Sequence, residues 1–418
     1  MAWVLLGLAL VWGQTATAWN WHAVARSPDA APTSSYTPKW GWVRVVGDTV
    51  YIMGTYTGNS QQLGLPTTGS PISSGLPDGT AYVHTYLAAY NRQNGRLAWW
   101  MWFSRSSANC WGTDIEVDPQ GRIFLLLISH HTVNWEYRDT LNNNASGSFM
   151  VSGVGGDRFS YVVKVEPQAG ATPTVNATYV GIQGGGVGSY VDLKHLLQVG
   201  GYLYATGSFV RGGGSSLSLG GIAISIPLPL FSPIEAALIV RLNATTLSDH
   251  QVGQLYVQDG LLSFRPVRGH DVAYDGVNNQ LRWLVETTAL PGDLRYQQGG
   301  GSTSLGAAQQ GLWAVSLNSS LGSPSAVRLA ATSGLGESPF VQVRGDTLIW
   351  AIADNRAYTI QGNGGFPTTS GFDRLLLVEQ ALSSLAVVRS FESPRFGNGI
   401  RLYDLLGERE GRLLYLAG

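Results

Sequence analysis

The stretch TDIEVDPQGRIFLLLIS (Thr113–Ser129) decides the fold. Two runs of apolar and β-branched residues flank the segment Asp118-Pro119-Gln120-Gly121, whose residues favour chain reversal. This pattern predicts a β-hairpin. The same strand–turn–strand pattern recurs at Trp42–Tyr56, Tyr190–Phe209, His270–Thr287, Phe340–Asp354 and Ile400–Gly418.

A second hairpin pattern, with a polar turn, alternates strictly with the first. It occurs at Tyr86–Phe103, Tyr161–Val180, Ala237–Val257, Leu312–Ala331 and Leu375–Phe391. One hairpin of each kind gives four antiparallel strands, and such sheets repeated around an axis form a β-propeller. We therefore expect an all-β protein with six blades of four antiparallel strands. A pair of β-sandwiches is the alternative, but it does not require this regular recurrence.

The sixth unit stops at Gly418 after two strands, so the ring needs strands from elsewhere. Trp19–Val24 resembles the outer strand of the first unit, which predicts that this N-terminal strand closes the ring. Residues 1–18 combine an apolar run with Ala16-Thr17-Ala18, a pattern typical of a signal peptide. Alternatively Ala2–Gly13 is retained as a further closing strand, or the segment is donated to a neighbouring subunit. Residues 19–418 are expected to form one domain.

The composition excludes several classes of protein. Hydrophobic residues make up 44% and charged residues 13%, so the chain can bury a large core. The net charge is −1 and no basic stripe occurs, which argues against nucleic-acid binding. The apolar N-terminal run is too short to span a membrane. A single cysteine, Cys110, excludes an intrachain disulfide and is expected to be a small buried residue.

Thr113–Ser129, together with YIMGTYTG (Tyr51–Gly58) and YLYATGSF (Tyr202–Phe209), resembles the bacterial beta-propeller repeat known as the SBBP repeat. LPTTGS (Leu65–Ser70) and FPTTSG (Phe366–Gly371) add to the resemblance, which extends over Trp40–Gly418. The Asp-x-x-Gly turn is complete only at Asp118–Gly121, so the chain is a divergent example. The resemblance implies a secreted or surface-attached bacterial propeller. It implies no particular activity.

Long polar segments separate the second and third strands of each complete unit, at Thr57–Gly79, His130–Gly156, Val210–Pro233, Thr288–Ala308 and Asn355–Gly371. We expect these segments to be loops that emerge on one face and form a binding or assembly surface. The aromatic residues within them are candidate contacts for protein or carbohydrate: Trp135, Tyr137, Tyr296 and Tyr358. Anchoring of each loop onto its sheet is the alternative role.

The sequence lacks the usual signatures of catalysis. It has no metal-binding motif, nucleophile motif or phosphate-binding loop, and it implies no cofactor. One group of polar residues is positioned at the starts of the innermost strands, where we expect it to line a central channel: Arg44, Asp114, Asp192, His270, Asp271 and Arg401. Carboxylates and a histidine that converge there would suit a hydrolase or lyase.

These observations favour a secreted or cell-surface protein that binds or assembles through its loops and is not an enzyme. The expected partners are another protein, a surface polysaccharide or further copies of the chain. Two alternatives remain from the sequence. One is a filament subunit that donates a strand, and the other is a carbohydrate-active enzyme acting at the channel.

Overall fold

The computed structural model describes much of the chain from residue 39 onward, and every described element is a β-strand. The described residues are 39–57, 62–63, 72–73, 82–104, 108–130, 132–139, 144–150, 158–168, 171–183, 188–211, 216–224, 234–258, 264–288, 292–332, 339–354, 356–360, 365–366, 374–392, 404–407 and 414–417. The expected signal or donated strand and the closing strand Trp19–Val24 lie outside this part. No helix in the described residues has the length and apolar character needed to cross a membrane.

Five antiparallel sheets contain most of the strands. The first sheet, β1-β2-β5-β6-β9-β10, comprises β1 Lys39–Val46, β2 Thr49–Thr57, β5 Val83–Asn91, β6 Leu97–Ser104, β9 Thr132–Asp139 and β10 Asn144–Met150. The second sheet, β7-β8-β11-β12-β15-β16, comprises β7 Cys110–Val117, β8 Ile123–Ser129, β11 Phe159–Gln168, β12 Ala171–Gln183, β15 Ser216–Leu219 and β16 Ile222–Ile224.

The third sheet, β13-β14-β17-β18-β22-β23, comprises β13 Tyr190–Val199, β14 Tyr202–Arg211, β17 Ile234–Asn243, β18 Gln251–Gln258, β22 Gly292–Gln298 and β23 Gly301–Ala308, with β19 Phe264–Arg265 also paired to β18. The fourth sheet, β20-β21-β24-β25-β28-β29, comprises β20 Val267–Asp275, β21 Gln280–Thr287, β24 Gly311–Asn318, β25 Ser325–Thr332, β28 Tyr358–Ile360 and β29 Gly365–Phe366.

The fifth sheet, β26-β27-β30-β31, comprises β26 Phe340–Arg344, β27 Thr347–Asp354, β30 Arg374–Ala381 and β31 Val387–Glu392. Two short hairpins complete the described strands, β3 Gln62–Leu63 with β4 Ile72–Ser73 and β32 Asp404–Gly407 with β33 Leu414–Ala417.

Both predicted kinds of hairpin are present. The first four strands of each of the five sheets are two successive hairpins, and all of their pairings are antiparallel. Local turn chemistry explains why they form. In the β7–β8 turn, the Asp118 carboxylate accepts the main-chain N–H groups of Gln120 and Arg122 at 3.0 and 2.9 Å, and Gly121 adopts a φ of 79°.

The long insertions are not the loops that the sequence led us to expect. Each of the five contains a hairpin, and four of these hairpins pair with the outermost strand of the preceding sheet. β9 pairs with β6, β15 with β12, β22 with β18, and β28 with β25. Each unit from the second to the fifth therefore supplies strands to two sheets. The expectation of a loop-covered face is wrong for these segments, because their polar and aromatic residues continue a sheet.

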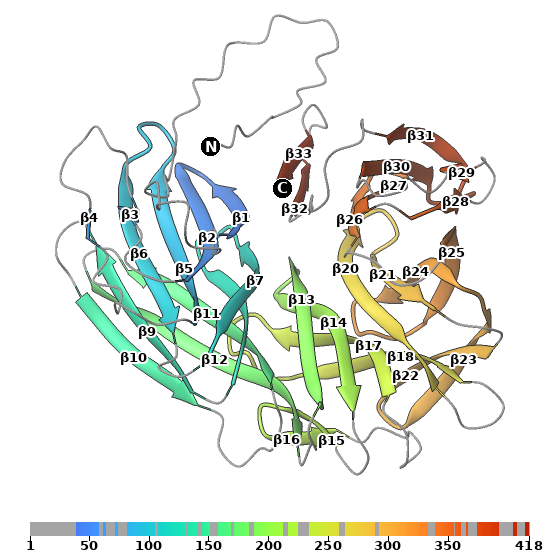
Figure 1. Cartoon of the computed structure of the whole chain (residues 1–418), viewed down its shortest axis with the longest axis horizontal. Coiled ribbons are helices and arrows are strands. Elements are labelled where there is room, and N and C mark those ends of the chain that lie inside the picture. The colour runs from blue at the N-terminus through green and yellow to red at the C-terminus, as the bar shows by residue number, and fades with distance from the viewer. Residues whose placement is uncertain are drawn as a thin grey trace, which may run out of the picture.

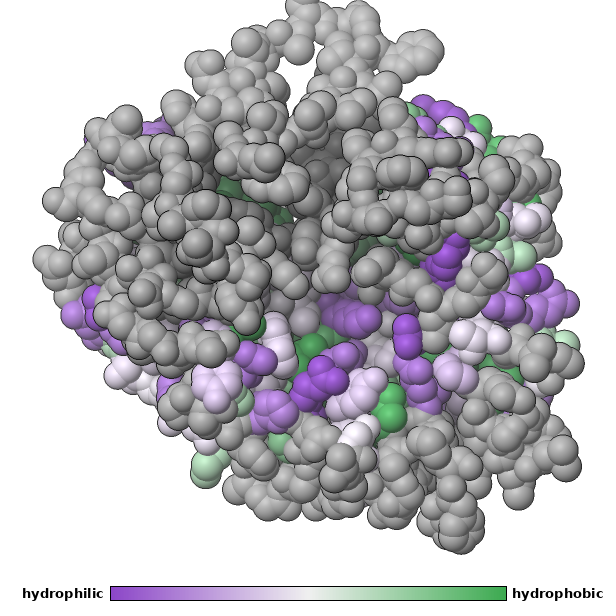
Figure 2. Space-filling model, viewed as in Figure 1, coloured by the Kyte–Doolittle hydropathy of each residue, from purple (hydrophilic) through white to green (hydrophobic). Residues whose placement is uncertain are grey.

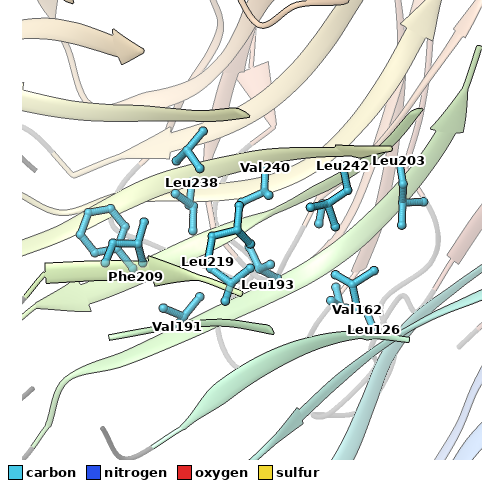
Figure 3. Packing of buried hydrophobic residues seen from close by; sticks show 14 of the residues in the cluster. Leu126, Val162, Val191, Leu193, Leu203, Phe209, Leu219, Leu238, Val240 and Leu242 are labelled. Carbon is cyan, nitrogen blue, oxygen red and sulfur yellow. The ribbon is translucent and has the colours of Figure 1, made fainter. Parts of the chain in front are cut away.

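Neighbouring sheets pack face to face through separate apolar cores. The core between the second and third sheets includes Leu126, Val162, Leu193, Leu203 and Leu238, all fully buried (Figure 3). Similar cores lie between the first and second, third and fourth, and fourth and fifth sheets. Because both faces of the inner strands are covered, strands such as β8 are buried along their whole length and read as continuous apolar runs.

The first strand of each sheet faces the middle of a round arrangement (Figure 1). These strands contact one another in order, β1 with β7, β7 with β13, β13 with β20, and β20 with β26. β26 also contacts β32, and β32 contacts β1. Hydrophilic residues gather near the middle of this face (Figure 2).

Candidate functional site

Four of the innermost strands carry a β-bulge, and the candidates Asp114, His270 and Asp271 lie at two of these bulges. The register of pairing shifts between Trp40 and Trp42 in β1, between Gly112 and Asp114 in β7, between Leu193 and His195 in β13, and between Gly269 and Val272 in β20. A bulge inserts an extra residue and redirects the side chains beside it. It therefore allows polar groups on these strands to reach the neighbouring sheet.

Asp114 connects three sheets. Its Oδ2 accepts the main-chain N–H of Leu196 in β13 at 2.7 Å, and its Oδ1 accepts that of Ile115 at 2.7 Å. The guanidinium of Arg44 in β1 lies 3.3 Å from Oδ1 and 3.2 Å from Glu116 Oε1. The Asp114 side chain is buried, so these contacts compensate for its removal from water. The Asp114 carboxylate thus links the second sheet to the first and the third.

Asp271 repeats this arrangement two sheets further on. Its Oδ1 accepts the N–H of Val272 at 2.8 Å, and its Oδ2 accepts that of Val341 in β26 at 2.9 Å. His195, from β13, approaches Asp271 Oδ1 at 3.8 Å and packs edge-on against the ring of Phe340. Burial, and then electrostatic interactions with His270, Lys194 and Arg44, lower the pKa of His195 well below 6.5. The imidazole is therefore neutral near pH 7.

His270 does not line a channel. Its side chain is fully buried, and its Nε2 lies 3.5 Å from Oε2 of Glu286 in β21. Burial lowers the pKa of His270, although Glu286 opposes this shift. Burial would raise the pKa of Glu286, but His270 and the Arg356 guanidinium, 2.5 Å from Oε1, lower it instead. The prediction that His270 lines a central channel is therefore wrong, because its imidazole is buried between the packed strands.

Asp192 is the described candidate that faces open space. It lies with Arg158 in the wall of a cavity of about 270 Å³, together with Trp42, Thr55, Trp111, Gly112, Thr113 and Ile128. These residues come from the first three sheets. One carboxylate oxygen of Asp192, Oδ1, is buried and accepts no hydrogen bond. Arg401, the remaining candidate, lies outside the described part of the chain.

The candidate loop aromatics lie in strands. Tyr137 in β9 is buried and packs against Trp99, with ring centroids 5.8 Å apart. Tyr296 in β22 is buried and its hydroxyl donates to the Leu321 carbonyl at 2.6 Å. Tyr358 in β28 is buried and accepts a hydrogen bond from Arg356 at 2.6 Å. We correct the expectation that these side chains are exposed, because they anchor the inserted hairpins.

Trp135 in β9 is half-buried and lies across Gly147 of β10. A Cβ atom at Gly147 would stand 2.7 Å from the indole ring. The glycine thus leaves room for Trp135 against its own hairpin. This contact also fits the anchoring role that the sequence left as the alternative.

The structure adds Trp42, Trp111 and Arg158 to the candidate residues. A signal for the two tryptophans was present, because each stands near the start of an innermost strand, as Asp192 does. Arg158 precedes a third strand and gave no such signal. In the described residues, no group of three or more His, Cys, Asp or Glu side chains is placed to hold a metal ion.

Comparison with known proteins assigns no family to this arrangement. No protein-family model matches the sequence, and no curated protein matches it significantly. The sheets, the links between them and the cavity are the features that bear on its function.

Proposed function

We propose that this chain is a six-bladed β-propeller, secreted or attached to the cell surface, that acts as a non-enzymatic binding scaffold. The five sheets are its first five blades in this proposal. β32 and β33 begin the sixth, which Trp19–Val24 completes. Export follows from the cleavage pattern at Ala16-Thr17-Ala18 and from the resemblance to SBBP-repeat proteins. The partner is a surface polysaccharide or an envelope protein.

Two apolar sheet faces support the sixth blade. On the first sheet, one face forms the core with the second sheet, and the opposite face carries Tyr90, Trp100 and Trp102 in a separate cluster. On the fifth sheet, Ile349 and Ala351 likewise lie opposite the core shared with the fourth sheet. β32 contacts the innermost strands of both sheets. A sixth sheet between them buries both faces.

The use of Asp114 and Asp271 as links carries the argument for binding rather than catalysis. Each of these carboxylates accepts two main-chain N–H groups, one in its own strand and one in the next innermost strand. A general acid or base needs a carboxylate within reach of the substrate proton. Both groups instead hold adjacent sheets together, while the cavity at Asp192 keeps unpaired polar groups for a ligand.

The proposal is tested with the purified full-length chain and isolated bacterial envelope material. Peptidoglycan, capsular polysaccharide and outer-membrane vesicles are incubated with the protein and sedimented. We expect the protein to sediment with at least one of these materials, with no release of soluble reducing sugars. Failure to sediment with any of them overturns the binding function. Release of reducing sugars that the Asp114→Asn variant abolishes would establish the hydrolase instead.

A further inference from the structure

The cavity at Asp192 has the composition of a ligand site. Two indole side chains, Trp42 from β1 and Trp111 from β7, lie in its wall with the hydroxyl-bearing Thr55 and Thr113. Asp192 and Arg158 supply one negative and one positive charge. The site exists only because the first three sheets meet there, so their links through Asp114 also hold its wall in place.

Both charged groups have unused hydrogen-bonding capacity. Asp192 Oδ1 is buried without a donor, and a buried carboxylate oxygen without a partner is costly. The Arg158 guanidinium lies 4.6 Å from the centre of the Tyr190 ring, and within the described structure it forms no ion pair with Asp192. Asp192 lines the cavity, so its other carboxylate oxygen is the acceptor offered to a bound molecule. An acceptor and a donor are thus available to a bound molecule.

These groups select the chemistry of the ligand. A strong acceptor and five N–H donors together match a molecule whose groups both donate and accept, as hydroxyl groups do. An anion is attracted by Arg158 but repelled by Asp192, and a cation the reverse, so the wall gives a net charge on the ligand no advantage and a neutral polar ligand matches it. The indole rings offer flat apolar surfaces that suit the C–H face of a sugar ring. An apolar ligand would leave both charges unsatisfied.

We propose that this cavity binds one neutral monosaccharide unit of a surface polysaccharide. Asp192 accepts hydrogen bonds from sugar hydroxyls, Arg158 donates to sugar oxygens, and Trp42 and Trp111 pack against the ring. The volume of about 270 Å³ is just below that of pockets for drug-sized ligands, which suits a single sugar ring. This inference rests on the proposed binding function and names its ligand class and site.

Isothermal titration calorimetry of the full-length protein tests this site. The probes are the methyl glycosides of glucose, galactose, mannose and N-acetylglucosamine, with glycine as a zwitterion and glucuronate as an anion. We expect at least one neutral glycoside to bind. Asp192→Asn and Trp111→Ala should each weaken that binding about tenfold or more, and Arg158→Gln should also weaken it.

The control variant is Asp346→Asn, which removes the same charge from an exposed turn in the fifth sheet. It should bind as the wild type does. Near-ultraviolet circular dichroism of every variant verifies that the fold is retained, and Trp111→Phe, which keeps an aromatic ring, should bind more tightly than Trp111→Ala.

Three results would overturn the inference: no glycoside binds, the Asp192 and Arg158 variants bind as tightly as the wild type, or glycine binds in preference to every glycoside. The saccharide site and the proposed scaffold function are refuted by different results. Sedimentation with envelope material without glycoside binding refutes only the saccharide site. Failure to sediment with any envelope material refutes the scaffold function even if a glycoside binds.

Discussion

The inserted hairpin β15–β16 should stabilise the second sheet, although its residues lie between two strands of the third. Leu217 and Leu219 of β15 are fully buried in the core between these sheets. Their strand pairs with β12, where Leu217 faces Ile182 and Leu219 faces Val180. Replacing both leucines with alanine removes the apolar groups that hold the hairpin on this edge.

The size of the effect follows from the burial. A buried Leu→Ala substitution costs about 2–5 kcal/mol, and about 3 kcal/mol is reasonable for each of these side chains. The two leucines share neighbours, so their effects should not add fully, and we expect about 5 kcal/mol for the pair. Ile222 of β16 is 58% exposed in the same hairpin, so Ile222→Ala should cost less than about 1 kcal/mol.

Urea unfolding gives the free energies, and hydrogen exchange followed by mass spectrometry locates the change. Exchange should rise in the Val180–Gln183 part of β12, while the β14–β17 pairing in the third sheet keeps its protection. The Ile222→Ala variant should show neither change. A double variant that loses less than about 1 kcal/mol, or loses protection in β14 and β17 but not in β12, would refute the reasoning.

Three further outcomes follow from the contacts between sheets. Asp114→Asn removes a charged acceptor from a buried main-chain N–H and should lower the free energy of unfolding by about 2–3 kcal/mol. The control Glu116→Gln should lower it by less than about 1 kcal/mol, and equal losses in urea titrations would contradict the role of Asp114 as a link between sheets. Burial raises the pKa of the Cys110 thiol to about 12, so a disulfide reagent at about pH 8 should label native protein only as it unfolds, and immediate labelling would show the thiol to be accessible. Burial lowers the pKa of His195 and His270 below 6.5, so the unfolded chain takes up protons first as the pH falls. Their stabilising contribution is present above pH 6.5 and is lost below it, so the urea midpoint should decrease as the pH is lowered from about 7 to about 5.5. His195→Gln should reduce this dependence on pH, and a midpoint that increases as the pH is lowered over this range would exclude the buried neutral state.

The hairpins were predictable because their signals are local. Thr113–Ser129 contains its own turn residues between two apolar runs, and the β7–β8 pair forms there. The destination of the inserted hairpins was not predictable in this way. TVNWEYRD (Thr132–Asp139) alternates in polarity as a strand does, but nothing within it specifies that β9 pairs with β6 rather than forming an independent loop. That pairing depends on a partner strand in the preceding unit.

The candidate site was only partly predictable, for a related reason. Asp114 and Asp192 occur in similar positions near the starts of innermost strands, and the sequence treats them alike. The bulge in β7 redirects Asp114 toward the main chain of β13, whereas Asp192 precedes the bulge in its own strand and faces the cavity. The different roles arise from where each aspartate stands relative to the register shift of its own strand, which residue types alone do not reveal.

The pairing of each inserted hairpin with the preceding sheet sets an order on folding during synthesis. The fourth strand of the first sheet ends at Ser104, yet its last two strands are complete only when Met150 has left the ribosome. The outer edge of each of the first four sheets therefore waits for the following unit. For the same reason, no unit from the second to the fifth can be deleted or duplicated cleanly, because its excision would also strip two strands from the sheet before it.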